Sequence, residues 1–163
     1  MVINQRCIRD GRFNPFVMRR HSSTVQMDKL VQSGDVLINS TGIGTLGRVA
    51  QVLSPPRNCT VDSHVTIVRP VPEIDVDFLG AMLLAMEHHF ASLGVGSTGQ
   101  TELSRDRISD TLVLTASVDH QGAFGAVVHP LRERSGGVVE ANQLLRDTRD
   151  LLLRHLMTGT QLT

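Results

Sequence analysis

The sequence predicts a mixed α/β (α+β) fold, in which a small twisted sheet or half-barrel with packed helices is followed by a long coiled-coil-type helix. Short apolar segments alternate with glycine- and proline-rich turns over residues 34–70, which is typical of strands. Apolar residues recur at helical spacing over residues 77–93, and at every seventh position over residues 124–152. We therefore expect a compact domain over residues 1–116 and a helical segment over residues 117–163.

Length and composition suit one domain with a core plus an appended helix: 163 residues, 40% of them hydrophobic and 20% charged. The formal net charge is zero, but residues 1–57 carry eight lysines and arginines against three acidic residues, whereas residues 58–163 carry eight against thirteen. A basic first third of the chain suits contacts with phosphates, and a chance asymmetry on solvated faces is the alternative. Aromatic residues make up 3%, which argues against a protein that binds single strands by stacking their bases.

No apolar run approaches the roughly 18 residues of a membrane span, and the N-terminus lacks an apolar signal region, so we expect a cytoplasmic protein that does not bind membranes. Cys7 and Cys59 lack metal-ligand spacing, which predicts reduced thiols. His88 and His89 point to different sides of a helix, and no acidic pair completes a ligand set. We expect neither a metal nor a cofactor.

The compact domain is expected to start with an extended and irregular segment over residues 4–20, which contains five arginines. Strands are expected at residues 36–38, 48–53 and 61–69, with a turn at residues 54–58 because its prolines cannot donate to a ladder. A helix over residues 77–93 follows, capped by Asp75 or Asp77 and ended by Gly94. Residues 112–115 are expected to form a further short packed element.

Catalysis is not expected. Asp62, Ser63 and His64 are residue types of a nucleophilic relay, but consecutive positions of a strand cannot form one. The sequence therefore predicts a non-enzymatic protein.

Two loops rich in glycine and hydroxyl groups, residues 39–47 and 94–105, are expected near one end of the sheet. Their glycines let the backbone approach a partner closely. The second loop comes within one residue of a phosphate-binding P-loop, because Gly94 and Gly99 are followed by Gln100 and Thr101. It lacks the lysine and follows a helix instead of opening one, which argues against nucleotide binding. A connection that binds nothing is the other alternative.

An apolar stripe marks the C-terminal helix, which Ser117 is expected to cap. The stripe is expected to face a partner, and its residues are Phe124, Leu131, Val138, Ala141, Leu145, Leu152 and Leu156. At 1.5 Å per residue the helix would be about 60 Å long, longer than the domain beside it. A helix folded back on its own sheet is the alternative.

Three blocks occur in a fixed order along the chain: Gly34-Asp-Val-Leu-Ile-Asn-Ser-Thr-Gly-Ile-Gly-Thr-Leu-Gly-Arg-Val49, Asp62-Ser-His-Val-Thr-Ile-Val-Arg-Pro70 and Gly96-Ser-Thr-Gly-Gln-Thr-Glu-Leu-Ser-Arg105. Together they resemble the target-recognition domain of the DNA-specificity subunit of type I restriction–modification systems. Ile3-Asn-Gln-Arg-Cys-Ile-Arg-Asp10 is similar to a further segment of that domain. The resemblance runs from about residue 3 to the C-terminus, and the combination is more specific than any one block.

The resemblance implies a non-catalytic module that directs methyltransferase and restriction subunits to double-stranded DNA. Members of this family join two recognition domains through long helices that pair antiparallel and dock the methyltransferase subunit. This chain would correspond to one half, shortened at its N-terminus, which pairs with a second half or a second copy through its C-terminal helix. Two identical halves would read an inverted repeat. No S-adenosylmethionine or ATP site is implied.

Candidate DNA contacts divide by chemistry: arginines would neutralise phosphates, and polar loop side chains would contact base edges or shape the loops. The candidates are Arg6, Arg9, Arg12, Arg19, Arg20, Asn39, Ser40, Thr41, Thr45, Arg48, His64, Ser97, Thr98, Gln100, Thr101, Glu102 and Arg105. Motifs that are shared by proteins with different target sequences are expected to maintain the structure and not to determine the sequence that is read. The side chains that contact bases could therefore also lie in residues 6–29, where the resemblance is weaker. The alternative function is an interaction module that binds a methyltransferase through its helix but does not bind DNA.

Overall fold

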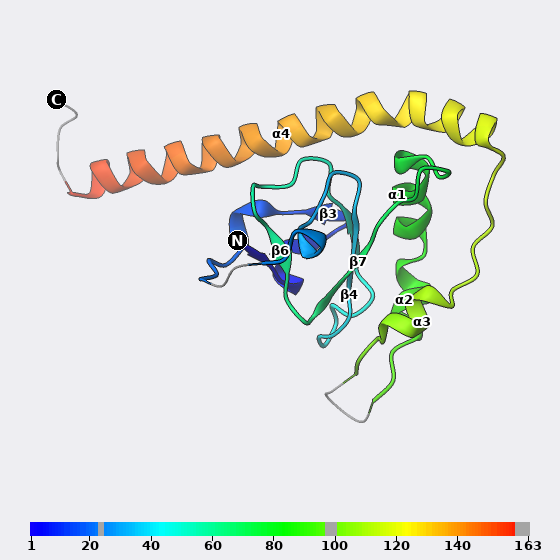
Figure 1. Ribbon diagram of the computed structural model, residues 1–163. Coiled ribbons are helices and arrows are strands. Elements are labelled where there is room, and N and C mark those ends of the chain that lie inside the picture. The colour runs from blue at the N-terminus through cyan, green and yellow to red at the C-terminus, as the bar shows by residue number, and fades with distance from the viewer. Residues whose placement is uncertain (23–24, 97–100, 159–163) are drawn as a thin grey trace. The chain divides into compact units, whose positions relative to one another are not determined.

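The computed structural model describes residues 1–22, 25–96 and 101–158. It divides into two compact units, Met1–Gly125 and Ala126–Thr163. The first unit contains the strands and the short helices, and the second contains most of the long helix α4 (Figure 1). The predicted α+β class with a long C-terminal helix is confirmed.

A five-stranded sheet forms the frame of the first unit, with strand order β2-β3-β5-β4-β7. Its strands are β2 (Ile8–Arg9), β3 (Arg12–Phe13), β4 (Val36–Asn39), β5 (Val49–Gln51) and β7 (Val65–Val68). Strand β4 is antiparallel to both β5 and β7, whereas β3 joins β5 in parallel. The strands predicted at residues 36–38 and 48–53 are present, and the second is shorter than expected. A separate parallel pair consists of β1 (Val2–Ile3) and β6 (Thr60–Val61).

Strand β4 is apolar on both faces because both faces of the sheet are covered. Leu37 points into a core that contains Ile3 and Ile8. Val36 and Ile38 point the other way, into a second core formed with helices α1 (Val76–Ala85) and α2 (Glu87–Ser92). The sheet is therefore fixed from both sides, which gives the loops at its ends a firm base.

The helix predicted over residues 77–93 is two helices, because the chain breaks at Met86. The predicted cap at Asp75 is confirmed: its carboxylate accepts from the Phe78 N–H at 2.8 Å. Met86 has φ −93° and ψ 9°, and its N–H is directed to the carbonyls of Leu83 and Leu84, which closes α1 in a tight last turn. No glycine or proline marks this break, so local propensity did not reveal it.

The strand predicted over residues 61–69 is also interrupted. Its first residues belong to β6 and its last to β7, and these strands lie in different sheets. A turn separates them, in which the Asp62 carboxylate accepts from the His64 N–H at 3.0 Å. Asp62, Ser63 and His64 thus occupy a turn and not the consecutive strand positions that were expected.

Residues 112–115 are not the packed element that was expected. They follow α3 (Arg105–Ser109) as a segment without secondary structure, and Leu112 and Leu114 are each 96% exposed. Ile108 of α3 fills the second core in their place. An apolar run of four residues therefore does not by itself identify a buried element.

Helix α4 spans Val118–Thr158 and continues without interruption through Pro130. Its first residues belong to the first unit and are tied to α1. The buried Gln121 side chain accepts from the Asp75 N–H at 3.0 Å and donates to the Ala116 carbonyl at 2.8 Å. Phe124 meets Phe78 edge-on, with ring centroids 5.9 Å apart. The first residue of the predicted stripe thus packs within its own unit.

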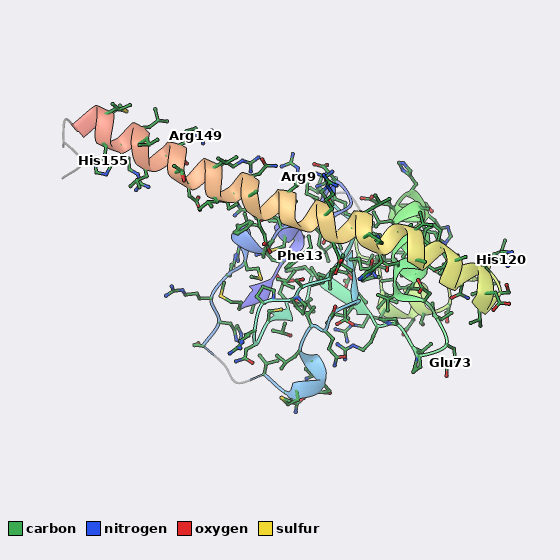
Figure 2. All side chains as sticks on the ribbon, turned by 90° about the horizontal axis from the view of Figure 1, so that it is seen from above. Arg9, Phe13, Glu73, His120, Arg149 and His155 are labelled. Atoms are coloured by element: carbon green, nitrogen blue, oxygen red, sulfur yellow. The ribbon has the colours of Figure 1, made fainter. Side chains whose placement is uncertain are left out.

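The rest of the apolar stripe is exposed. Leu131, Leu145 and Leu152 are 63%, 66% and 46% exposed, and Val138, Ala141 and Leu156 are exposed as well. Polar side chains such as Arg149 also project from the helix (Figure 2). None of the helices in the described parts of the chain combines the length and the apolar character that crossing a membrane requires.

Candidate nucleic-acid interface

The first glycine-rich loop, residues 39–47, leaves the end of β4 and is closed by the Asn39 side chain. Asn39 is fully buried, and its amide donates to the carbonyls of Gln5 and Thr45 at 3.2 and 3.1 Å. The Asn39 carbonyl also accepts from the Gly47 N–H at 2.8 Å, which joins the two ends of the loop. Asn39 therefore shapes the loop from within.

A chain of polar side chains supports the outer part of this loop. Gln5 accepts from the Thr45 hydroxyl at 3.0 Å and donates to the Thr41 hydroxyl at 3.5 Å. The Thr41 hydroxyl also pairs with His64 Nδ1 at 2.9 Å. Thr41 and His64 come from the first two sequence blocks of the resemblance, and Gln5 comes from the further N-terminal segment. These linked hydrogen bonds, which are part-buried at Gln5 and exposed at His64, hold the side chains in place relative to one another.

The described residues of the second glycine-rich loop, 94–96 and 101–105, contact the first loop through Glu102 and Leu103. Glu102 forms an antiparallel bridge with Thr41 and a second bridge with Val95. The Leu103 N–H donates to the Ser40 carbonyl at 2.8 Å, and the Leu103 side chain is buried in the second core. The expected neighbourhood of the two loops is confirmed for these residues.

Not all candidate side chains on the two loops reach the surface. Thr101 and Glu102 are exposed, and Thr41 and Thr45 are half-buried. Ser40 is buried, with its hydroxyl 2.6 Å from that of Thr66, so it supports the loop as Asn39 does. Ser97, Thr98 and Gln100 lie outside the described residues.

The candidate arginines are divided between different places. Arg6 follows Gln5, whose side chain contacts the first loop, and the half-buried Arg48 directly follows that loop in the chain. Arg105 is the last residue of the second loop and the first residue of α3. Arg9 and Arg12 lie on the β2–β3 hairpin, where Arg12 pairs with Gln51 at the end of β5 away from the loops. The five N-terminal arginines therefore do not form one group.

Arg19 and Arg20 lie on another strip of the surface. The Arg19 backbone pairs with Val2 at the start of β1, and both arginine side chains are exposed. Burial raises the pKa of Cys7, and it outweighs the opposing effects of the Asn4 hydrogen bond and of the Arg6 and Arg19 guanidinium groups. Burial likewise raises the pKa of Cys59. Both thiols are thus held in the neutral form, which does not suit a nucleophile.

One ion pair is part of the frame and not of the interface. Asp35 is fully buried, and Arg69 donates to its two carboxylate oxygens at 2.9 and 2.8 Å. The hydrogen bond to Asp35 raises the pKa of Arg69. Arg69 also donates to the Leu30 carbonyl at 2.8 Å, which ties a long connection to the sheet.

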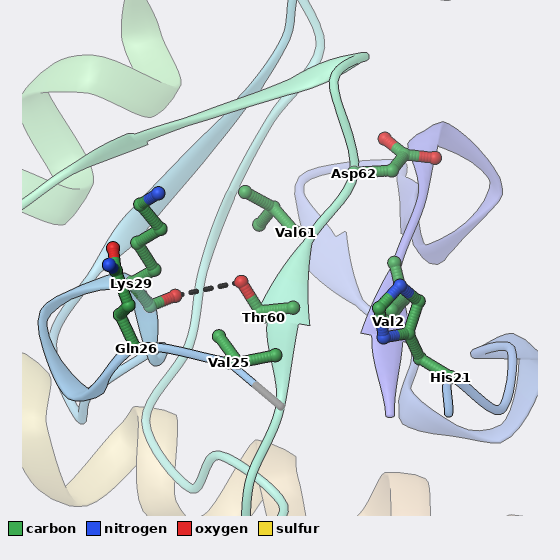
Figure 3. Close-up of a pocket in the computed structure, with 8 residues that line it drawn as sticks. All are labelled: Val2, His21, Val25, Gln26, Lys29, Thr60, Val61 and Asp62. Carbon is green, nitrogen blue, oxygen red and sulfur yellow. Dashed lines mark hydrogen bonds between the residues drawn. The ribbon is translucent and has the colours of Figure 1, made fainter. Parts of the chain in front are cut away.

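A depression of about 450 Å³ lies next to β1 and β6 (Figure 3). His21, Lys29 and Asp62 line it, together with Val2, Val25, Gln26, Thr60 and Val61. The Thr60 hydroxyl donates to the Lys29 carbonyl at its wall, at 2.8 Å. None of the polar loop residues proposed to contact bases lines this depression.

Two residues of the interface were missed by the sequence analysis. Gln5 was quoted as part of a motif, but no periodicity or spacing distinguished it as the hub between Thr41 and Thr45. Ile43 lies between two glycines and is 86% exposed. Its residue type alone predicts burial, so this exposure could not be predicted from the sequence. The Gly-Ile-Gly spacing was the only available signal.

Within residues 1–22, 25–96 and 101–158, no group of three or more His, Cys, Asp or Glu side chains is placed to hold a metal ion. The arrangement at the two loops offers hydroxyls, an imidazole, a carboxylate and nearby guanidinium groups. A scan against protein-family models finds no match to this chain, and neither does a search of curated proteins.

Proposed function

We propose that this chain is a non-catalytic DNA-recognition module of the kind found in the DNA-specificity subunits of type I restriction–modification systems. One observation carries the proposal. The three sequence blocks that bear the resemblance are far apart in the chain, yet they meet where Thr41 contacts both His64 and Glu102. Residues brought together in this way are suited to act as one surface.

The chemistry of this surface fits a duplex better than a small molecule. Hydroxyl, imidazole and carboxylate groups can donate to or accept from base edges, and Arg6, Arg48 and Arg105, which neighbour these residues in the sequence, would add positive charge. The glycines of the first loop would allow its backbone to approach a groove closely. Partner subunits would supply methylation and cleavage.

Helix α4 would supply the partner contacts. Its exposed leucines from Leu131 to Leu152 form a stripe that a second recognition half, a second copy or a methyltransferase subunit could cover. An interaction module without DNA binding would use the same stripe, so the stripe alone does not distinguish the two functions.

Selection from a randomised duplex library tests the proposal. The purified chain is mixed with the library, alone and with the methyltransferase subunit of a type I system, and bound duplexes are sequenced. We expect one motif to be enriched, with an inverted repeat if two identical chains bind together. Absence of any enriched motif under both conditions, with retained binding to the methyltransferase subunit, would favour the interaction module.

The arginines give a second test on the enriched duplex. Arg48→Ala and Arg105→Ala should each lower the slope of log affinity against log salt by about one for each bound chain, because each removes one phosphate contact. Arg9→Ala is the matched control, because Arg9 lies on the β2–β3 hairpin and pairs with Asp10 at 3.8 Å. An unchanged slope for Arg48→Ala and Arg105→Ala would remove both from the interface.

A further inference from the structure

A large aliphatic side chain stands at the tip of the first glycine-rich loop. Ile43 is 86% exposed and lies between Gly42 and Gly44. Exposure of such a side chain forgoes the free energy that its burial would contribute. Within the loop Leu46 packs against the second core, whereas Ile43 belongs to neither core, so the isoleucine is not needed for the packing of the domain.

The loop is built so that Ile43 stays at the tip. The Gly42 carbonyl accepts from the N–H groups of Thr45 and Leu46 at 3.1 and 3.0 Å. Gly42 and Gly44 both have positive φ, 109° and 68°, which turns the chain sharply on either side of Ile43. The Gln5 side chain lies so close to Gly42 that a Cβ atom there would collide with it. Ile43 is thus presented by a supported turn.

The surroundings of Ile43 favour DNA over a protein partner. The supports on this side of the loop are the polar side chains of Gln5, Thr41, Thr45 and His64. Val95 of the second loop is also exposed, at 54%, but two aliphatic side chains are still a smaller apolar centre than a protein interface normally has. In the major groove, by contrast, an A·T pair presents a single methyl group beside a hydrogen-bond acceptor and a donor. One aliphatic group among polar groups is complementary to that edge.

We propose that Ile43 contacts the C5 methyl group of a thymine in the major groove and so sets a preference for an A·T pair at one position of the target. This inference rests on the proposed DNA-recognition function and adds the base edge that the first loop reads. It assigns Thr41 and Thr45 to holding the tip, and Ile43 to the contact itself.

Deoxyuridine tests the contact, because it differs from thymidine only by the methyl group. The duplex enriched by selection is prepared with thymine and with uracil at every A·T pair of the half-site. The wild-type chain should bind the uracil duplex about fourfold more weakly for each methyl it contacts. Ile43→Ala should bind the thymine duplex more weakly than the wild type does, and it should bind both duplexes equally well.

Val71→Ala is the matched control. Val71 is 53% exposed and follows β7 beyond Val68, which pairs with Val36 at the end of the sheet opposite the first loop. This variant should discriminate between the two duplexes as the wild type does. Circular dichroism should show unchanged folding for both variants, since neither side chain is buried.

The outcomes separate the two proposals. If no duplex is enriched, the DNA-recognition function fails and the methyl contact fails with it. If a duplex is enriched but the wild type binds its thymine and uracil forms equally, the methyl contact alone is wrong. If Ile43→Ala weakens binding but still discriminates between the two forms, another residue reads the methyl group and the assignment to Ile43 is overturned.

Discussion

Gly47 is the residue at which the first glycine-rich loop touches the helical layer. Its φ is 79°, and a Cβ atom there would collide with the backbone of Phe90 and Ala91 in α2. Gly44 has a similar φ of 68°, but the space around it is open. A side chain at Gly44 would therefore add backbone strain alone, whereas a side chain at Gly47 would add both strain and a clash with α2.

Alanine at these two positions should give different losses of stability. Gly44→Ala should lower the free energy of unfolding by about 1 kcal/mol, because it adds only the strain of a positive φ. Gly47→Ala should lower it by about 3 kcal/mol or more, because α2 must also move away from the loop. Urea unfolding measures both values. Equal losses would show that the loop does not depend on its contact with α2.

The ion pair between Asp35 and Arg69 also allows a prediction for individual residues. Arg69→Leu should lower the free energy of unfolding by about 3 kcal/mol, because it leaves a carboxylate buried without its partner. Adding Asp35→Asn to this variant should restore part of the loss by removing the buried charge. Arg9→Ala, which breaks an exposed pair with Asp10, should change stability by less than about 0.5 kcal/mol.

At the scale of elements, the start of α4 is attached to α1 through one buried amide. Gln121→Ala should lower the free energy of unfolding by about 1–2 kcal/mol, because it leaves the Asp75 N–H and the Ala116 carbonyl without their partner. Gln143→Ala is the control on the same helix, where the amide donates to the exposed Asp147. Similar effects of the two variants in urea unfolding would mean that Gln121 does not anchor the helix.

Elements with local signals could be predicted from the sequence. The Asp75 cap, the buried strand β4 and the long helix α4 each depend on residues a few positions apart. Strands β2 and β3 have two residues each and are too short to show a period. The order β2-β3-β5-β4-β7 includes a parallel pair between distant segments, which no local pattern encodes.

The candidate site was predictable in its backbone and not in its side chains. Glycines and hydroxyl residues marked both loops, and those loops lie together. Residues 4–20 fold into β2, β3 and two 3-10 helices, which place successive arginines on different parts of the first unit, and no local pattern in the sequence indicates this. Gln5 became the hub only through contacts with residues 36 and 40 positions away.

At the scale of the whole molecule, the exposed stripe of α4 predicts association. If a second copy covers it, Leu145→Gln combined with Leu152→Gln should raise the dissociation constant of the pair at least about a hundredfold, because large apolar side chains leave the interface. Gln143→Ala, about 200° around the helix from Leu145, should leave it unchanged. Sedimentation equilibrium measures both. A wild-type chain that stays monomeric at high micromolar concentration would point to a different subunit as the partner.

The bridge between Thr41 and Glu102 has a practical consequence for redesign. The first loop is joined to residues 101–103 by this bridge and by the Leu103 hydrogen bond, although about 50 residues separate the two stretches along the chain. In a library that randomises one stretch alone, the new side chains would have to keep the contacts with the other, unchanged stretch. If the chain recognises DNA as proposed, experiments that change its target should therefore vary or transplant both stretches together, with Gln5 retained.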